Sequence, residues 1–133
     1  MNTKIASLAI TSNLLLCVVS LADDTADRIA SLNQLRQIGA LSLSFANANN
    51  GRFPKAFDEF LAFQKTVDRS LFISPYAADK TKPSYEILLP GERLSRIDNP
   101  ARAVFIRSLF RTVDGSALAS FADGHVELIK KTQ

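Results

Sequence analysis

A row of apolar and small residues near the N-terminus is the feature that most constrains the fold of this 133-residue chain. Side chains that recur every three or four positions share one face of a helix, and here they are Ile29, Leu32, Leu35, Gly39, Ser42 and Phe45. The sequence Asn-Ala-Asn-Asn-Gly favours a left-handed cap, so the helix is predicted to end between Ala46 and Asn49. At its other end, Asp24 or Thr25 is the predicted N-cap, because acidic residues there suit the helix dipole.

The first 22 residues have the pattern of a secretory signal peptide. Lys4 gives a basic start, an uninterrupted apolar run follows from residue 14 to residue 19, and small residues stand at Ser20 and Ala22. This pattern predicts cleavage after Ala22, which leaves residues 23–133 as a single domain in the periplasm or outside the cell. Cys17, the one cysteine of the chain, would be removed with the signal peptide.

A retained membrane anchor is the alternative for the same segment. The stretch from Ile5 to Ala22 is 18 residues long, just enough to span a bilayer, although Thr11-Ser12-Asn13 interrupts it. The two interpretations imply different locations: extracytoplasmic after cleavage, or anchored in the inner membrane without it.

The second half of the chain shows the residue types and turn signals of short β-strands. Four segments fit this pattern, within residues 84–90, 101–110, 116–122 and 125–129. A shorter helix is predicted between Phe57 and Phe63, and its phenylalanines are interpreted as core. The predicted fold class is therefore α+β, with a long N-terminal helix packed on an antiparallel sheet of three or four strands.

Asp123 and Gly124 separate the last two of these segments. An Asp-Gly pair between two β-type runs is a strong signal for a two-residue hairpin with a type I′ turn. Alternation along such a hairpin would place Phe121 on the core face together with Val126 and Leu128. His125 and Glu127 would then point to the other face.

The residue inventory offers little material for a catalytic or zinc site. His125 is the one histidine, and the predicted mature chain has no cysteine, whereas zinc takes about four nitrogen, sulfur or oxygen ligands. No catalytic or cofactor-binding residue is predicted, and the chain is predicted not to be an enzyme. The 16 basic residues are scattered among 13 acidic ones, unlike the clustered cations of a nucleic-acid groove, so no nucleic-acid partner is predicted.

Calcium is the one metal for which the sequence offers candidate ligands, Asp114 and Asp123. Calcium takes about six to eight oxygen ligands. Two aspartates that each precede a glycine are better explained as turn residues. We therefore predict no metal site and keep calcium at Asp114 and Asp123 as the alternative.

Three segments resemble one known family. The stretch LNQLRQIGALSLSFANANNGRFP, from Leu32 to Pro54, resembles the helix end and first loop of bacterial type II secretion pseudopilins and their prepilin-type relatives. RLSRIDNPARAVFIRS, residues 93–108, resembles the segment before their penultimate strands, and SFADGHVEL, residues 120–128, is similar to their C-terminal Phe-Ala-Asp-Gly-His-Val hairpin. This hairpin is common in the paralogues of Planctomycetes, Verrucomicrobia and Lentisphaerae. The resemblance covers most of residues 32–129 and implies a pseudopilin-like soluble domain.

The N-terminus departs from this family. Its members begin with a basic leader, a small residue and a Phe-Thr-Leu-Ile-Glu-type helix start, but here no glutamate precedes Glu59 and no glycine precedes Gly39. Prepilin peptidase therefore has no recognisable site. Two functions stay open: a non-enzymatic structural or assembly component related to type II secretion or type IV pili, and a secreted binding module that does not polymerise. The resemblance implies protein partners, such as pseudopilins or secretion components, with membrane contact only if the N-terminal segment is retained.

Overall fold

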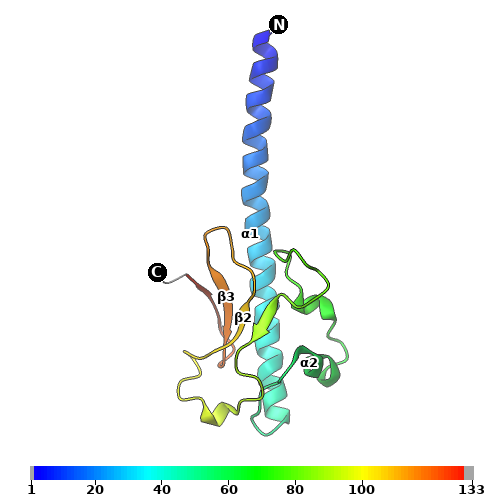
Figure 1. Ribbon diagram of the computed structural model, residues 1–133, viewed down its shortest axis with the longest axis vertical. Helices are drawn as coiled ribbons and strands as arrows, with labels where there is room; N and C mark the ends of the chain where they lie inside the picture. The colour runs from blue at the N-terminus through cyan, green and yellow to red at the C-terminus, as the bar shows by residue number, and fades with distance from the viewer. Residues whose placement is uncertain (1, 131–133) are drawn as a thin grey trace.

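The computed structural model describes the backbone of residues 2–130 and the side chains of residues 24–130. One long helix and a four-stranded antiparallel sheet make up most of the regular structure, so the predicted α+β class is confirmed. Figure 1 shows the helix running the full height of the molecule, with the other elements gathered around its C-terminal half. The N-terminal half of the helix projects away from this domain.

The long helix, α1 (Asn2–Ala48), has 47 residues, which corresponds to a length of about 70 Å. It passes without a break through Asp24 and Thr25, so in the uncleaved chain neither residue caps the helix as predicted. The predicted signal peptide and its cleavage site after Ala22 lie outside the residues whose side chains are described.

The C-terminal end of α1 follows the prediction. The Gly51 N–H donates a hydrogen bond to the Ala46 carbonyl at 2.7 Å, and the Asn49 side-chain amide donates to the Phe45 carbonyl at 2.7 Å. Asn50 and Gly51 adopt φ values of 58° and 77°, in the left-handed region. These contacts satisfy carbonyl groups that the helix leaves without an internal partner.

The elements after α1 are three short helical segments and four strands. They are α2 (Phe57–Phe63), η1 (Arg69–Phe72), β1 (Tyr85–Ile87), η2 (Leu94–Arg96), β2 (Val104–Ser108), β3 (Ala117–Phe121) and β4 (Val126–Ile129). The strands pair in the order β1-β2-β3-β4, each antiparallel to its neighbour, so the sheet is a simple meander. The spatial order of the strands is thus their order along the chain.

The core lies between α1, the inner face of the sheet and α2. Its fully buried members are Leu35, Ile38, Phe53, Phe60, Phe72, Tyr85, Phe105, Ile106 and Leu118. The phenylalanines of α2 and η1 contact one another, with ring centroids of Phe60 and Phe72 5.6 Å apart and those of Phe57 and Phe72 4.7 Å apart. The prediction that the phenylalanines of residues 57–63 form core is confirmed for Phe60, while Phe63 is 36% exposed.

Candidate functional site

Helix α1 approaches the last hairpin of the sheet closely at Gly39. A Cβ atom added to Gly39 would lie 2.8 Å from the Ser120 hydroxyl oxygen and 3.0 Å from the Gly124 carbonyl oxygen. A real Cβ essentially never approaches heavy atoms this closely, so a larger residue at position 39 would push the helix off the hairpin. Gly39 therefore allows the backbones to meet, as its place on the helix face predicts.

The other residues of the predicted packing face lie at different depths. Leu35 is fully buried and Ser42 is 2% exposed, whereas Leu32 and Phe45 are half-buried. Ile29 is 54% exposed and lies off the packed surface. At this level of the helix the buried position is Ser31. Ile29, two residues earlier, points outward from the edge of the helical stripe.

The hairpin between β3 and β4 has a three-residue loop instead of the predicted two-residue turn. The Gly124 N–H donates to the Phe121 carbonyl, and the Phe121 N–H donates to the His125 carbonyl, both at 2.9 Å. Gly124 has a φ of 93°, while Asp123 keeps a negative φ, which fits a type I turn followed by a glycine bulge. The predicted type I′ turn is therefore wrong, although Asp123 and Gly124 do lie in the turn.

This difference of one residue changes which side chains share a face. The rings of Phe121 and His125 stack with centroids 4.3 Å apart, so these two residues lie on the same face of the hairpin. Val126 and Leu128 lie opposite Ser120 and Leu118, on the face toward α1. The prediction that Phe121 shares a face with Val126 and Leu128, and that His125 points away from it, is wrong.

The side chain of His125 contacts residues of its own turn and strand. Its Nδ1 atom is hydrogen-bonded to the Asp123 carboxylate, and its Nε2 atom lies 3.7 Å from the Glu127 carboxylate. Partial burial would raise the pKa of Asp123, but hydrogen bonds from the His125 side chain and backbone N–H outweigh it, so this pKa is lowered. The side chain of His125 is 37% exposed. This arrangement holds the turn in place from its outer side.

Asp114 and Asp123 lie at opposite ends of β3 and cannot share one calcium ion. A five-residue strand is about 13 Å long from first to last Cα atom, which far exceeds the 2.3–2.6 Å, roughly, of a calcium–oxygen bond. Within residues 24–130, no group of three or more histidine, cysteine or acidic residues could hold a metal ion. Hydrogen bonds from Thr112 and Ser116 occupy Asp114 and lower its pKa to about 2.

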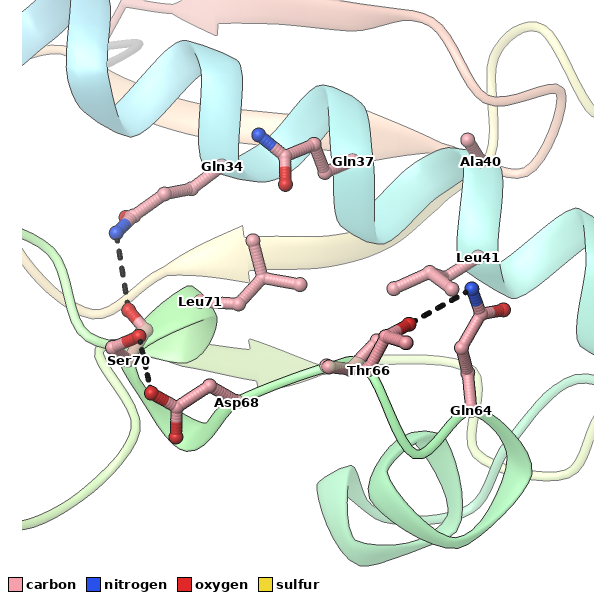
Figure 2. A pocket seen from close by; sticks show the side chains of 10 residues that line it. Gln34, Gln37, Ala40, Leu41, Gln64, Thr66, Asp68, Ser70 and Leu71 are labelled. Carbon is pink, nitrogen blue, oxygen red and sulfur yellow. Dashed lines mark hydrogen bonds between the residues drawn. The ribbon is translucent and has the colours of Figure 1, made fainter.

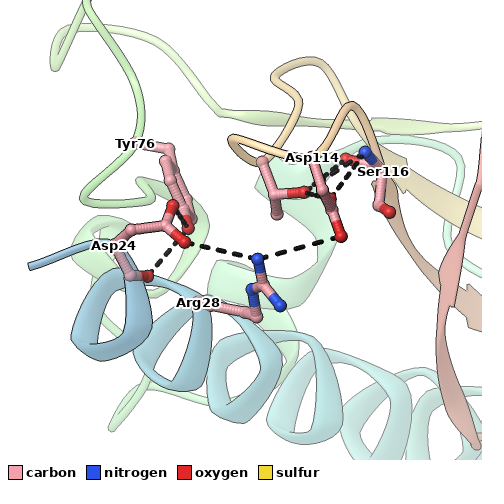
Figure 3. A network of polar contacts seen from close by, with 6 residues as sticks. Asp24, Arg28, Tyr76, Asp114 and Ser116 are labelled. Atoms are coloured by element: carbon pink, nitrogen blue, oxygen red, sulfur yellow. Dashed lines mark hydrogen bonds and ion pairs between the residues drawn. The ribbon is translucent and has the colours of Figure 1, made fainter. Parts of the chain in front are cut away.

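A polar cluster links α1 to two loops of the domain, and we call it the Tyr76 network (Figure 3). It comprises Asp24, Arg28, Tyr76, Thr112, Asp114 and Ser116. The Tyr76 hydroxyl donates to the Asp24 carboxylate at 2.5 Å, and the Arg28 guanidinium lies 3.3 Å from Asp24 and 4.0 Å from Asp114. Burial, followed by the bond to Asp24, raises the pKa of Tyr76 to about 12. The network holds the domain against α1 near the point where the projecting half begins.

The sequence contained only part of the signal for this network. Asp24 and Arg28 are four residues apart, a spacing that predicts an ion pair on a helix. Tyr76 reaches Asp24 from a loop 52 residues away along the chain, and local spacing carries no information about such a contact.

A groove of about 570 Å³ runs between α1 and the segment 64–71 (Figure 2). Gln34 crosses one end of it, where its amide donates to the Ile73 carbonyl at 2.8 Å and accepts from the Tyr85 hydroxyl at 2.7 Å. Its other walls are mixed: Gln37, Gln64, Thr66 and Ser70 are polar and uncharged, Asp68 is acidic, and Ala40, Leu41, Val67 and Leu71 are apolar. These contacts are those of a helix-to-loop junction.

In the part of the chain with described side chains, no helix is long and apolar enough to cross a membrane.

A comparison with protein-family models, with curated proteins and with solved structures finds no match to this chain.

Proposed function

We propose that this protein is a non-enzymatic extracytoplasmic protein of the pseudopilin type, acting as a structural or assembly component related to type II secretion or type IV pilus systems. The observation that carries the proposal is the form of α1, a single 47-residue helix of which only the C-terminal half is surrounded by the domain (Figure 1). The order of the elements supports it, since a long N-terminal helix precedes a four-stranded antiparallel sheet. Its partners are then pseudopilins or secretion components.

The apolar composition of the projecting half of α1 favours its being covered by a partner or a bilayer, or removed. From Ile5 to Ala22 its sequence contains no charged residue. Leaving apolar surface in water costs about 25 cal/mol per Å², so an uncovered apolar helix of this length is unfavourable. Packing against the helices of neighbouring subunits would cover it, as the pseudopilin resemblance implies.

A secreted binding module that does not polymerise is the second candidate. The pattern of residues 1–22 favours it, because cleavage after Ala22 would remove the projecting half of α1. The domain formed by residues 24–130 would remain, and the core residues and the members of the Tyr76 network named above all lie within it.

Cys17 allows a direct test, because the sequence places the one cysteine of the chain in the projecting half. The full gene, with and without Cys17→Ser, is expressed in a diderm bacterial host. Whole cells are treated with a bismaleimide crosslinker, and the mass of the purified protein defines its N-terminus.

An assembly component predicts a chain that keeps Cys17 and gives crosslinked species, which Cys17→Ser abolishes. A chain that begins at Asp23 and is recovered in the periplasm or the medium supports the binding module instead. A chain that keeps residue 17, yet stays monomeric and uncrosslinked at high expression, contradicts the assembly role.

A further inference from the structure

The face of the sheet turned away from α1 carries a shallow cavity of about 320 Å³, which we call the outer trough. Its apolar floor is formed by Leu88, Val104, Ala117 and Ile129. Ala117 lies on the inner strand β3 directly opposite Ile129 of β4, so a small side chain stands beside a large one. Because side chains stand upright on a sheet, this difference in size lowers the floor at Ala117.

The helix leaves this face uncovered. Ser120 points toward Gly39 of α1, and neighbouring residues of a strand point to opposite faces, so Ala117 and Ala119 face away from the helix. Glu86, Arg107 and Glu127 share this outer face by register with Ala119. The trough is therefore a surface of the folded domain that does not depend on the fate of residues 1–22.

The rim of the trough is cationic. Arg107, Arg111 and Lys130 line it, and its described lining residues include no carboxylate. Arg107 forms an ion pair with Glu86, with 2.5 Å between the guanidinium nitrogen and the carboxylate oxygen. The Arg111 guanidinium donates to the Gly115 carbonyl at 3.0 Å, which fixes its position but does not neutralise its charge. Arg111 and Lys130 thus leave positive charge beside the apolar floor.

We propose that the outer trough binds an acidic, extended peptide segment of a partner protein. An apolar side chain of the segment would lie in the depression above Ala117, which is itself only 4% exposed, and against Ile129, and its neighbouring carboxylates would pair with Arg111 and Lys130. Carboxylates are the natural partners of guanidinium and ammonium groups. A nucleic acid is the less suitable occupant, because bases bind by stacking on aromatic side chains and the described lining of the trough contains none.

The test uses the full chain and an end-blocked, fluorescein-labelled hexapeptide of alternating glutamate and valine. Fluorescence anisotropy at low ionic strength should show saturable binding that weakens as salt is added. Lys130→Glu should raise the Kd by about fivefold, because it replaces an attraction by a repulsion. Ala117→Leu should weaken binding by a comparable factor, because it fills the floor without changing the charge.

Lys65→Glu is the matched control, since it makes the same change of charge at an exposed position outside the trough. Its Kd should stay within about twofold of the wild type. The proposal is overturned if Lys65→Glu weakens binding as much as Lys130→Glu, which would show attraction to net charge alone. Unchanged binding in both Ala117→Leu and Lys130→Glu, with circular dichroism showing folded protein, would also overturn it. Tighter binding of a single-stranded hexanucleotide than of the peptide would assign the trough to a different class of partner.

Discussion

At the scale of single residues, Gly124 meets two separate requirements of the last hairpin. Its φ of 93° lies in the left-handed region, which glycine enters at little cost. A Cβ atom at this position would also lie 2.9 Å from the Cδ1 atom of Leu43 on α1. Gly115 has a similar φ of 83°, but a Cβ atom there would meet no heavy atom within 4 Å.

Comparing Gly124→Ala with Gly115→Ala separates these two requirements. Gly115→Ala should lower the free energy of unfolding by about 1 kcal/mol through the backbone conformation alone. Gly124→Ala should lower it by about 2 kcal/mol, because the backbone cost is joined by the contact with Leu43. Urea unfolding followed by circular dichroism measures both values. Equal losses would mean that Leu43 moves aside freely and that only the φ angle matters.

The hydroxyl oxygen of Ser120 is a buried polar atom without a hydrogen-bond partner among the described residues. The residue as a whole is fully buried. Ser31 is also fully buried, but its hydroxyl is hydrogen-bonded to Ser74 at 2.6 Å. The two serines are therefore equally buried, but only the Ser31 hydroxyl has a hydrogen-bond partner among the described residues.

Ser120→Ala should raise the free energy of unfolding by about 1 kcal/mol, because it removes an unsatisfied group. Ser31→Ala should lower it by about 1 kcal/mol, because it breaks a buried hydrogen bond. Thermal unfolding of the two variants and the wild type shows whether each substitution raises or lowers the stability. A loss of stability in Ser120→Ala would show that its hydroxyl group is satisfied in solution, contrary to the structure.

At the scale of elements, α1 packs on the domain along its C-terminal half, and two of its contacts lie far apart along the helix. The contact at Gly39 lies against the hairpin, and the bond of Tyr76 to Asp24 lies about 22 Å, roughly fifteen helical residues, nearer the N-terminus. Tyr76 also stacks on Phe110, with ring centroids 5.1 Å apart, so its loop is fixed by both an apolar and a polar contact. The second attachment determines where the projecting half of α1 begins.

Tyr76→Phe should weaken the upper attachment alone, since phenylalanine keeps the stacking on Phe110 but cannot donate to Asp24. Amide hydrogen exchange should become faster in residues 24–31 of α1 and stay unchanged around Gly39. The free energy of unfolding should fall by about 1 kcal/mol, the net value of one hydrogen bond. Exchange that increases equally along residues 24–48 would show that α1 responds as one unit, against two separate attachments.

The elements themselves were largely predictable, while their mutual register was not. The helix end at Ala48 followed from local residues, because Asn and Gly readily adopt the left-handed conformation that ends a helix. The Asp-Gly pair located the last turn but not its loop length. The same dipeptide fits a two-residue loop or a three-residue loop with a glycine bulge. The structure has the three-residue loop, in which Gly124 contacts α1.

At the scale of the whole molecule, the two tyrosines make the stability of the fold depend on pH in the alkaline range. Burial raises the pKa of Tyr85 from 10.0 to about 12, and burial together with the bond to Asp24 raises that of Tyr76 to about 12. Both groups have a lower pKa, near 10, in the unfolded chain. The folded state therefore favours the protonated phenols relative to the unfolded state.

The contribution of these phenols to stability should be fully present below about pH 10 and be lost as the pH rises toward about 12. The chain contains two tyrosines and no tryptophan, so the ultraviolet absorbance of tyrosinate follows them directly. The titration midpoint should lie well above that of the protein in concentrated urea. Tyr76→Phe should leave one tyrosine, Tyr85, that still titrates late. A native midpoint near 10 for both would contradict the raised pKa values.

The sequence by itself determined the α+β class, the long helix with its C-terminal end, the four strands and the place of the last turn. Each of these depends on neighbours within a few positions, where backbone preference and side-chain periodicity act. Only the tertiary structure decided that Ile29 faces outward, that His125 stacks on Phe121, that Asp114 and Asp123 lie far apart, and that Tyr76 binds Asp24. Those features depend on how α1 and the sheet meet, and that geometry arises from contacts between residues distant along the chain.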